Sequence, residues 1–416
     1  LGRDRTELLD RLRAVARDRS APGVIRTGGE QKPGGLVFMY SGQGSQRPGM
    51  GRELYGVLPE FTEALDEACA ALDAHLDIPV REVMFADAAD SGAALLDQTL
   101  YTQTGLFALH TALTRQLQAW GVRPDHLIGH SIGELTAAHV AGVLSLADAA
   151  RLVTARARLM NELPHGTGGM LAAQAGPEAL AEYLERHGRT EIAAYNSPVA
   201  TVLAGPADAL AALAEELGAA GIRTRGLKVS HAFHSAQMDP VLAEFTSAAA
   251  GLTYRAPELP VVSNLTGTAA TAGELTDAAY WAEHIRRPVR FHQGLAHLAG
   301  EGATAFLEIG PGATLTTLTR AILPTDDGAA VIPALRPARR SPDADAPTGP
   351  ADEPTALLHA MGELHAHGVG PRWTDVLPHG RSVELPTYAF QRRRYWIDPE
   401  EPAAAGPAES GLHYRT

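Results

Sequence analysis

One short stretch decides the fold of this chain: His126-Leu127-Ile128-Gly129-His130-Ser131-Ile132-Gly133. Residues 126–128 have the character of a short buried strand, and residues 134–144 have helical spacing. A G-x-S-x-G motif between a strand and a helix is the pattern of a nucleophile elbow, whose tight turn lifts the serine hydroxyl off the sheet. Ser131 is therefore a candidate nucleophile, and the Ile132 amide is a candidate donor to an oxyanion. The alternative is a glycine-bounded turn with an incidental serine.

Strand-like and helical segments alternate on both sides of this stretch. Short apolar runs bounded by glycines predict strands, and apolar residues at helical spacing predict helices. The expected strands cover residues 36–40, 126–128, 261–263 and 306–309, and the main expected helices cover 59–76, 106–120, 134–144 and 146–160. This alternation predicts an α/β fold with a parallel sheet.

Residues 169–230 follow a different order. Strands are expected over 170–174, 192–196, 201–204 and 223–229, with helices over 177–187 and 207–220. The order βαββαβ is that of a ferredoxin-like unit, and α/β patterns resume after it. We therefore expect an α/β-hydrolase-like large subdomain with a parallel sheet, into which a ferredoxin-like small subdomain is inserted.

The two ends of the chain differ in composition from this centre. Residues 1–16 have the apolar spacing of a helix, and a Gly/Pro-rich linker follows over 21–35. Residues 325–354 are rich in Asp, Pro and Ala, which predicts a loop or linker, and a helix is expected over 355–367. Because the sequence begins at Leu1 without Met, we expect a piece of a longer protein.

Composition excludes several classes of protein. The 416 residues carry a formal net charge of −13, which argues against broad nucleic-acid binding. No stretch of about 18 apolar residues without charges is present, so no transmembrane helix is expected. Cys69 is the only cysteine, which excludes an internal disulfide and a cysteine metal cluster and favours a reducing, cytoplasmic location.

Other parts of the sequence offer partners for Ser131. His231 and His234 follow the last strand of the inserted unit, so either can face the elbow as a base, although most histidines are surface or structural residues. The loop Gly42-Gln43-Gly44-Ser45-Gln46-Arg47 lacks the third glycine of a dinucleotide site. Its glutamines, Gln43 and Gln46, are instead candidate oxyanion donors.

With these residues in view, the chain resembles the acyltransferase domains of modular polyketide synthases, and more distantly the malonyl-CoA:acyl-carrier-protein transacylases of fatty acid synthesis. The resemblance covers residues 35 to 396. The matching motifs are Gly42-Gln43-Gly44-Ser45-Gln46, Gly129-His130-Ser131-Ile132-Gly133-Glu134, Arg156-Ala157-Arg158-Leu159-Met160, Tyr195-Asn196-Ser197-Pro198, His231-Ala232-Phe233-His234-Ser235, Val262-Ser263-Asn264, Glu308-Ile309-Gly310-Pro311-Gly312 and Leu385-Pro386-Thr387-Tyr388-Ala389-Phe390. One departure is Tyr40-Ser41, where the family more often has Phe-Pro.

The resemblance implies a role for each candidate residue. Ser131 attacks a thioester and His234 takes its proton, while Gln43 and the Ile132 amide supply the oxyanion site. A backbone carbonyl near His284 orients the base, with assistance from Asn264. Arg156 binds the free carboxylate of a malonyl group; without the family it reads as a helix-surface arginine, like Arg151 and Arg158.

The resemblance also implies the reaction and its partners. Malonyl-CoA acylates the serine, and the phosphopantetheine thiol of an acyl carrier protein collects the acyl group in a ping-pong reaction. No metal and no bound cofactor are expected, and neither a nucleic acid nor a membrane is an expected partner. An adjoining ketosynthase is an expected partner. The implied parts are the tail of a ketosynthase-to-acyltransferase linker (1–35), a large subdomain (36–165 and 231–325), a small subdomain (166–230), a post-acyltransferase linker (326–398) and a disordered tail (399–416).

Selectivity for malonyl is expected from the motif around the base. His231-Ala232-Phe233-His234 resembles the malonyl form, because a phenyl ring at Phe233 fills the space of an α-methyl group. Ile132 agrees with this assignment. The alternatives are a larger or unusual extender unit, a thioester hydrolase, or a non-catalytic docking module. Arg286-Arg287 and residues 392–394 are candidate contacts for an acidic carrier protein, with solvated surface arginines as the other interpretation.

Overall fold

The structure, a computed structural model, describes residues 1–2, 4–26, 34–87, 91–323, 328–336, 352–377 and 384. It divides the chain into two units, residues 1–376 and 377–416, and all that follows concerns the first. The motif expected over 385–390, the arginines 392–394 and the tail over 399–416 lie outside the described residues.

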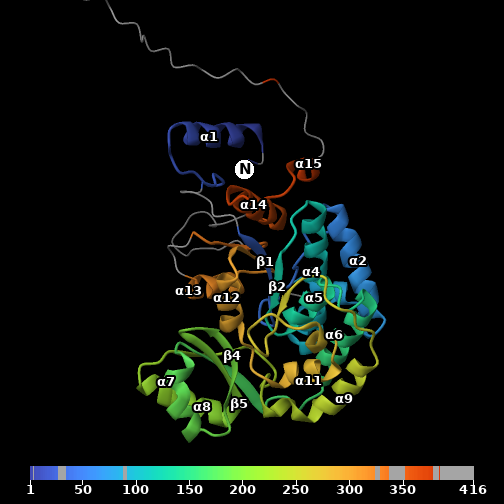
Figure 1. Cartoon of the computed structure of the whole chain (residues 1–416), viewed down its shortest axis with the longest axis vertical. Helices are drawn as coiled ribbons and strands as arrows, with labels where there is room; N and C mark the ends of the chain where they lie inside the picture. Colours follow the sequence, from blue (N-terminus) through green and yellow to red (C-terminus); the bar gives the residue numbers. More distant parts are fainter. Residues whose placement is uncertain are drawn as a thin grey trace, which may run out of the picture. The chain divides into compact units, whose positions relative to one another are not determined.

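The larger sheet has five strands in the order β7-β2-β1-β8-β9, and every neighbouring pair is parallel. Strands β1 and β2 of this sheet are labelled in Figure 1. The strands are β1 (Gly35–Tyr40), β2 (His126–Gly129), β7 (Val261–Val262), β8 (Ala303–Ile309) and β9 (Ala330–Pro333). The prediction of an α/β fold with a parallel sheet is confirmed. The prediction of a loop over 325–354 is wrong for β9, a short edge strand whose four residues are all buried.

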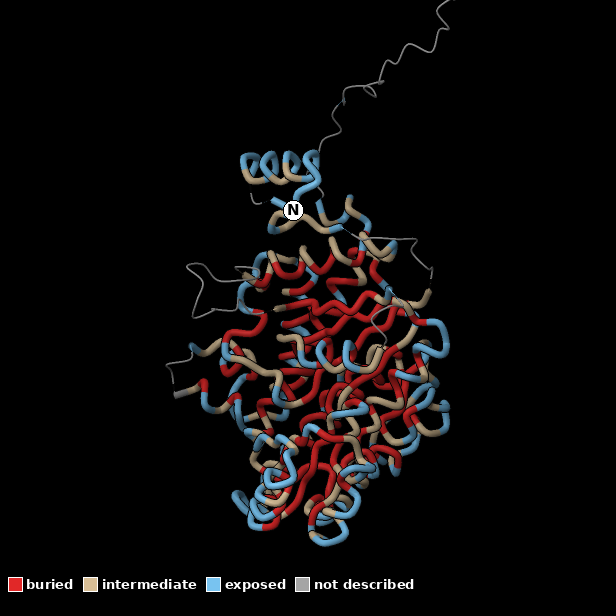
Figure 2. The backbone as a smooth tube through the Cα atoms, turned by 90° about the vertical axis from the view of Figure 1, so that its left-hand side faces the viewer, coloured by how far each residue is buried: buried red, intermediate tan, exposed pale blue. Residues whose placement is uncertain are grey.

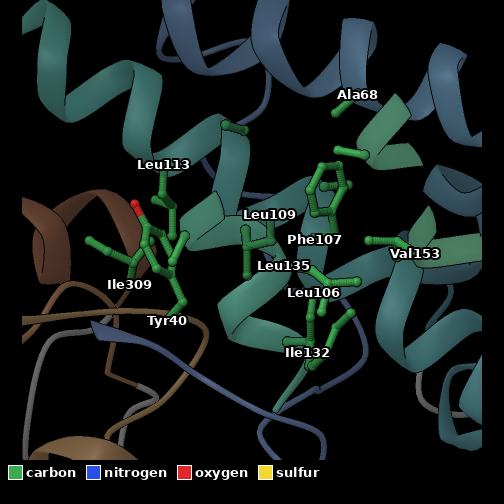
Figure 3. Close-up of a cluster of buried hydrophobic side chains, with 14 of the residues drawn as sticks. Tyr40, Ala68, Leu106, Phe107, Leu109, Leu113, Ile132, Leu135, Val153 and Ile309 are labelled. Carbon is green, nitrogen blue, oxygen red and sulfur yellow. The ribbon is translucent and has the colours of Figure 1, made fainter. Parts of the chain in front are cut away.

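Helices cover both faces of this sheet because its strands are apolar on both sides. Leu36, Phe38 and Tyr40 of β1 belong to the core shared with α2 (Pro59–Asp73), α4 (Thr99–Ala119), α5 (Ile132–Val140) and α6 (Leu146–Asn161), part of which Figure 3 shows. Val37 and Met39 face the other way, into the core formed with α12 (Phe291–Gly300) and α13 (Thr314–Ile322). Each fully buried side chain of this kind stabilises the fold by about 1.5–3 kcal/mol.

The smaller sheet is antiparallel and has the order β4-β5-β3-β6. Its elements are β3 (Gly168–Ala173), α7 (Pro177–Arg186), β4 (Glu191–Ser197), β5 (Ala200–Pro206), α8 (Ala207–Ala219) and β6 (Thr224–Gly226). This connectivity and strand order confirm the predicted ferredoxin-like unit. The last strand is shorter than the expected 223–229.

The remaining elements complete the large subdomain and its flanks. They are α1 (Arg5–Ala16), α3 (Val80–Phe85), η1 (Ser91–Asp97), η2 (Ala236–Met238), α9 (Asp239–Ala250), α10 (Ala272–Leu275), α11 (Ala278–Arg286), α14 (Glu353–Ala366) and α15 (Trp373–Val376). Helix α4 begins seven residues before the predicted start at residue 106, because its first turns are polar yet buried, a combination that apolar spacing does not reveal.

Burial separates the first helix from the rest of the unit. The tube of Figure 2 shows buried backbone through the sheets and exposed backbone along α1. Leu8, Leu9, Leu12 and Val15 form the predicted apolar face of α1, and all are more than a third exposed. In the described part of the chain, no helix is long and apolar enough to cross a membrane.

Candidate active site

Ser131 lies in a strained turn between β2 and α5. Its backbone φ is 53° and its ψ is −115°, a conformation that costs a non-glycine residue about 1–3 kcal/mol. The two flanking glycines make the turn possible. A Cβ on Gly129 would lie 2.0 Å from the Glu134 amide nitrogen, and one on Gly133 would lie 2.1 Å from the Tyr40 carbonyl oxygen. The turn therefore has the geometry expected of a nucleophile elbow.

Asn264, which follows β7, holds this turn in place. Its Oδ1 accepts a hydrogen bond from the Ser131 amide at 2.8 Å, and its Nδ2 donates to the Gly129 carbonyl at 2.8 Å. Its own backbone amide donates to Glu134 Oε2 at 2.6 Å. One buried side chain thus bonds to the backbone on both sides of His130.

Glu134 is fully buried beneath the elbow and is the centre of a polar cluster. The Tyr280 hydroxyl of α11 contacts Glu134 Oε1 and lies 2.7 Å from Ser263 Oγ. Burial, with the Glu134 charge beside it, raises the pKa of Tyr280 well above its usual value. Because a buried carboxylate needs donors, this cluster keeps Glu134 where it can bond Asn264. Sequence reasoning missed it, since Tyr280 and Glu134 are far apart in the chain.

His234 is the histidine that reaches the candidate nucleophile. Its Nε2 lies 2.8 Å from Ser131 Oγ, and its Nδ1 lies 2.9 Å from the Arg287 carbonyl oxygen. A carbonyl only accepts, so Nδ1 carries the proton and Nε2 is free to accept the serine hydroxyl. Burial, the Arg156 charge and His284 lower the pKa of His234 well below its usual value. His234 is therefore neutral at pH 7, as a base must be.

The carbonyl that orients His234 belongs to Arg287, so the expectation for His284 is wrong. Helix α11 ends at Arg286, and Arg287 has extended backbone, which lets its carbonyl turn toward His234. The His284 side chain is buried, with its Nε2 3.5 Å from Glu134 Oε2. Asn264 likewise bonds to the Ser131 turn and not to His234.

Arg156 of α6 is buried at the elbow and is not a helix-surface arginine like Arg151 and Arg158. One terminal nitrogen donates to Ser131 Oγ at 3.0 Å, and the other donates to Gln103 Oε1 at 2.6 Å. Burial lowers the pKa of Arg156 to about 9, partly offset by Glu134. Gln103, within a polar run of α4, is a further site residue that sequence reasoning missed.

The two predicted oxyanion donors lie on adjoining segments. Ile132 is the first residue of α5, where amides have no acceptor within the helix. Gln43 is half-buried on the loop after β1. That loop touches the elbow, since a Cβ on Gly42 would lie 2.8 Å from the His130 carbonyl oxygen.

The predicted selectivity residues are packed beside the base. Phe233 is 6% exposed and belongs to the same core as Ile132. Its ring centroid lies 5.9 Å from that of His231. His231 Nε2 lies 2.8 Å from the Leu163 carbonyl oxygen, so His231 is engaged as a structural contact and not with Ser131.

The small subdomain contacts the elbow directly. His130 Nε2 lies 2.9 Å from Asn196 Oδ1 of β4. Val289, just beyond the carbonyl that holds His234, exchanges backbone hydrogen bonds with β4: the Tyr195 amide donates to Val289 at 2.8 Å, and Val289 donates to Ala193 at 2.8 Å. The sequence motif at 195–198 thus includes Tyr195 and Asn196, whose hydrogen bonds connect β4 to the large subdomain.

Arg286 and Arg287, the described candidates for contacting an acidic carrier protein, differ in how far other residues of the chain already engage them. Arg286 donates to Asp239 at 2.7 Å and to Glu191 at 2.8 Å, so it is engaged within the chain. Arg287 is about half exposed and lies 3.4 Å from Glu283. Within the described ranges, no group of three or more His, Cys, Asp or Glu side chains is arranged to hold a metal ion.

A serine on an elbow, hydrogen-bonded to a histidine that a third group orients, defines the class of enzymes that form an ester with an active-site serine. The chain belongs to the acyl transferase domain family, which matches residues 37–348. It is therefore an acyltransferase, in agreement with the expectation from the sequence.

Polyketide synthases are among the proteins similar to this chain. The chain is 46% identical over 398 residues to the spectinabilin polyketide synthase system protein NorB of Streptomyces orinoci, covering 94% of this chain and 18% of that protein. It is 44% identical to polyketide synthase GfsA of Streptomyces halstedii, covering 99% of this chain and 5% of that protein. The chain thus corresponds to a small part of each.

Solved structures agree with the assignment to the acyl transferase domain family. The acyltransferase domain from the second module of the salinomycin polyketide synthase is 44% identical, with a TM-score of 0.81 over 94% of this chain and 87% of that one. The malonyl-CoA:acyl carrier protein transacylase FabD of Xanthomonas oryzae is 31% identical, with a TM-score of 0.67 over 73% of this chain and 96% of that one. These matches confirm the predicted fold class.

Proposed function

We propose that this chain loads a malonyl extender unit from malonyl-CoA onto the phosphopantetheine arm of an acyl carrier protein, as the acyltransferase of a polyketide synthase. One observation carries the proposal: Ser131 Oγ lies 2.8 Å from His234 Nε2 and 3.0 Å from a terminal nitrogen of Arg156. A nucleophile, its base and a cation for a free carboxylate thus meet at one oxygen. The family and its polyketide synthase members support the same assignment.

The proposed reaction has two transfers. Ser131 Oγ attacks the thioester carbonyl carbon while His234 Nε2 takes the hydroxyl proton. The C–S bond then breaks, and the proton passes to the leaving thiolate of CoA. In the second transfer the pantetheine thiol gives its proton to His234 and attacks the serine ester, which releases the Ser131 hydroxyl. The amides of Ile132 and Gln43 are the proposed donors to the oxyanion in both steps.

Two side chains support malonyl as the proposed extender unit. A guanidinium pairs with a carboxylate through two parallel hydrogen bonds, which favours a dicarboxylic acyl group at Arg156. Phe233, buried beside His234, is the proposed barrier to an α-substituent. The acyltransferase domain of SpnD, 34% identical to this chain with a TM-score of 0.75, was solved in complex with 2-(pent-4-yn-1-yl)malonyl. A larger extender unit therefore remains the alternative.

The organisation proposed from the sequence goes with this function. Residues 1–35 are proposed as the tail of a linker from an adjoining ketosynthase, 36–165 and 231–325 as the large subdomain, 166–230 as the small subdomain, and 326–398 as a linker, apart from the strand β9. The location is proposed to be cytoplasmic, and the reaction is proposed to need no bound cofactor.

Intact-protein mass spectrometry after exposure to a panel of acyl-CoAs tests the proposal. We expect one malonyl group per chain with malonyl-CoA, little or no methylmalonyl or acetyl adduct, and no adduct on the Ser131→Ala variant. Adduct formation with a larger malonyl derivative in preference to malonyl would favour the alternative extender. Absence of any adduct on the wild-type chain would favour a non-catalytic docking module.

A further inference from the structure

Arg156 is a buried cation that lies directly on the nucleophile. Its side chain is 1% exposed, and its two described hydrogen bonds go to neutral groups, Ser131 Oγ at 3.0 Å and Gln103 Oε1 at 2.6 Å. Its Nε is buried with no partner among the residues that the structure describes. The acidic group acting on it is Glu134, which is already bonded by the Asn264 amide and Tyr280. The described hydrogen bonds of Arg156 include none to a carboxylate, so an anionic group of a substrate can become its partner.

The same contact engages a lone pair of the nucleophile. Ser131 Oγ must present a lone pair to the thioester carbon, yet it accepts an N–H bond from Arg156. When His234 takes the serine proton, a second positive charge forms two hydrogen bonds away from the guanidinium. Like charges this close disfavour the protonated imidazole.

The other groups around His234 do not offset this repulsion. His284 of α11 and His130 of the elbow both disfavour a positive charge on His234, as burial does, and the facing group that favours it is the Arg287 carbonyl. Glu134 of α5 contacts His284 and Tyr280 and is not among the groups that act on His234. The charge that can be cancelled on substrate binding is thus that of Arg156.

We infer that the free carboxylate of the bound acyl group switches on the nucleophile: by pairing with Arg156 it releases Ser131 Oγ and allows His234 to accept the proton. This rests on the proposed function. It places selectivity in the rate of acylation as well as in binding, because an acyl group without a carboxylate leaves Arg156 on Ser131. A neutral acyl-CoA is then loaded slowly even when it saturates the site.

Single-turnover acylation tests this inference on the wild-type chain. Acyl-enzyme formation is followed by quenched-flow mass spectrometry at saturating malonyl-CoA or acetyl-CoA across the acidic pH range. We expect the low-pH midpoint with malonyl-CoA to lie about one pH unit or more above that with acetyl-CoA, since the carboxylate relieves the repulsion on His234. Formate, the smallest carboxylate, should speed acetyl loading saturably, whereas chloride at equal ionic strength should not.

Variants separate the switch from simple binding. Arg156→Gln should load acetyl faster than wild type, with its midpoint moved up toward the malonyl value and with no response to formate. Arg158→Gln, an exposed neighbour on α6, should behave as wild type in all three measurements. If Arg156→Gln does not fold, the wild-type comparison still decides.

Coincident midpoints for the two donors, together with no effect of formate on acetyl loading, would overturn the inference. In that case Ser131 would still carry malonyl, so the proposed function would stand. Failure of malonyl-CoA to acylate Ser131 at any pH would instead overturn the proposed function itself.

Discussion

Replacing Asn264 by alanine should disable the nucleophile without touching any reacting atom. The substitution removes two hydrogen bonds of 2.8 Å, one from the Ser131 amide and one to the Gly129 carbonyl. Each net hydrogen bond contributes about 0.5–1.5 kcal/mol, and each buried group left unpaired costs about 1–3 kcal/mol. Two groups lose their partner, so we expect the free energy of unfolding to fall by about 2–6 kcal/mol.

The effect on the rate follows from backbone strain. Ser131 is held at φ 53°, which costs about 1–3 kcal/mol, and Asn264 is the side chain bonded on both sides of this turn. Without it, the turn relaxes and Oγ moves away from His234. A displacement of about 1 Å costs about 10²-fold in rate, so we expect acylation by malonyl-CoA to slow by about that factor.

Two assays measure these changes. Urea unfolding followed by circular dichroism gives the stability, and single-turnover acylation gives the rate. Asn196→Ala is the matched control, because it removes one hydrogen bond to His130 and leaves the Ser131 amide bonded. It should lose about 0.5–1.5 kcal/mol and retain most of the rate. A folded Asn264→Ala variant that acylates within a few-fold of wild type would refute the reasoning.

Three further predictions concern selectivity and pH. Phe233→Ser should raise methylmalonyl loading relative to malonyl by about 10–200-fold, the range for one methylene-sized group, as measured by competition mass spectrometry; an unchanged ratio would contradict the steric role of the ring. Because the pKa of free His234 is lowered, kcat/KM for malonyl-CoA should stay level as pH falls through 6.5 and decline only below it, whereas a midpoint at 6.5 or higher would exclude the buried neutral base. Burial lowers the pKa of His110 to about 3. Below pH 6.5 the unfolded chain therefore binds a proton at His110, whereas the folded chain does not bind it until about pH 3. His110 should therefore lower the free energy of unfolding by about 1.4 kcal/mol for each pH unit as pH falls from 6.5 to about 3. The His110→Gln variant should show a smaller dependence of this free energy on pH, measured by urea titrations at several pH values.

The elements with local sequence signals are predicted well. The elbow glycines, the apolar run of β1 and the βαββαβ order of the small subdomain are each visible within a short window. Strand β9 was missed because its four residues lie in a segment dominated by Asp, Pro and Ala. Its strand conformation comes from pairing with β8, which is a tertiary effect.

Sequence predicts a site residue only where that residue is part of a recognisable motif. Ser131, His234 and Arg156 come together as the resemblance implied. The orienting carbonyl was misplaced by three residues, from Arg287 to His284, because a backbone group leaves no trace in the side-chain sequence. Gln103 was missed because a polar residue inside a buried helix is recognisable only once its partner is in place.

The Tyr40-Ser41 departure from the family has a structural explanation that the sequence alone does not reveal. The Tyr40 hydroxyl lies 3.1 Å from Thr114 Oγ1, and Ser41 Oγ lies 3.1 Å from His110 Nε2. Both polar groups are buried and bonded, so the departure leaves the elbow and its loop intact.

Transfer from the preformed acyl-enzyme tests the central claim most directly. The chain is loaded with malonyl-CoA, freed of CoA by rapid desalting, and mixed with an acyl carrier protein that carries phosphopantetheine or with the same protein lacking it. We predict that the malonyl group leaves Ser131 rapidly only with the first and is recovered as a thioester on the carrier. Loss of the group as free malonate at the same rate in both mixtures would contradict the account and identify a hydrolase.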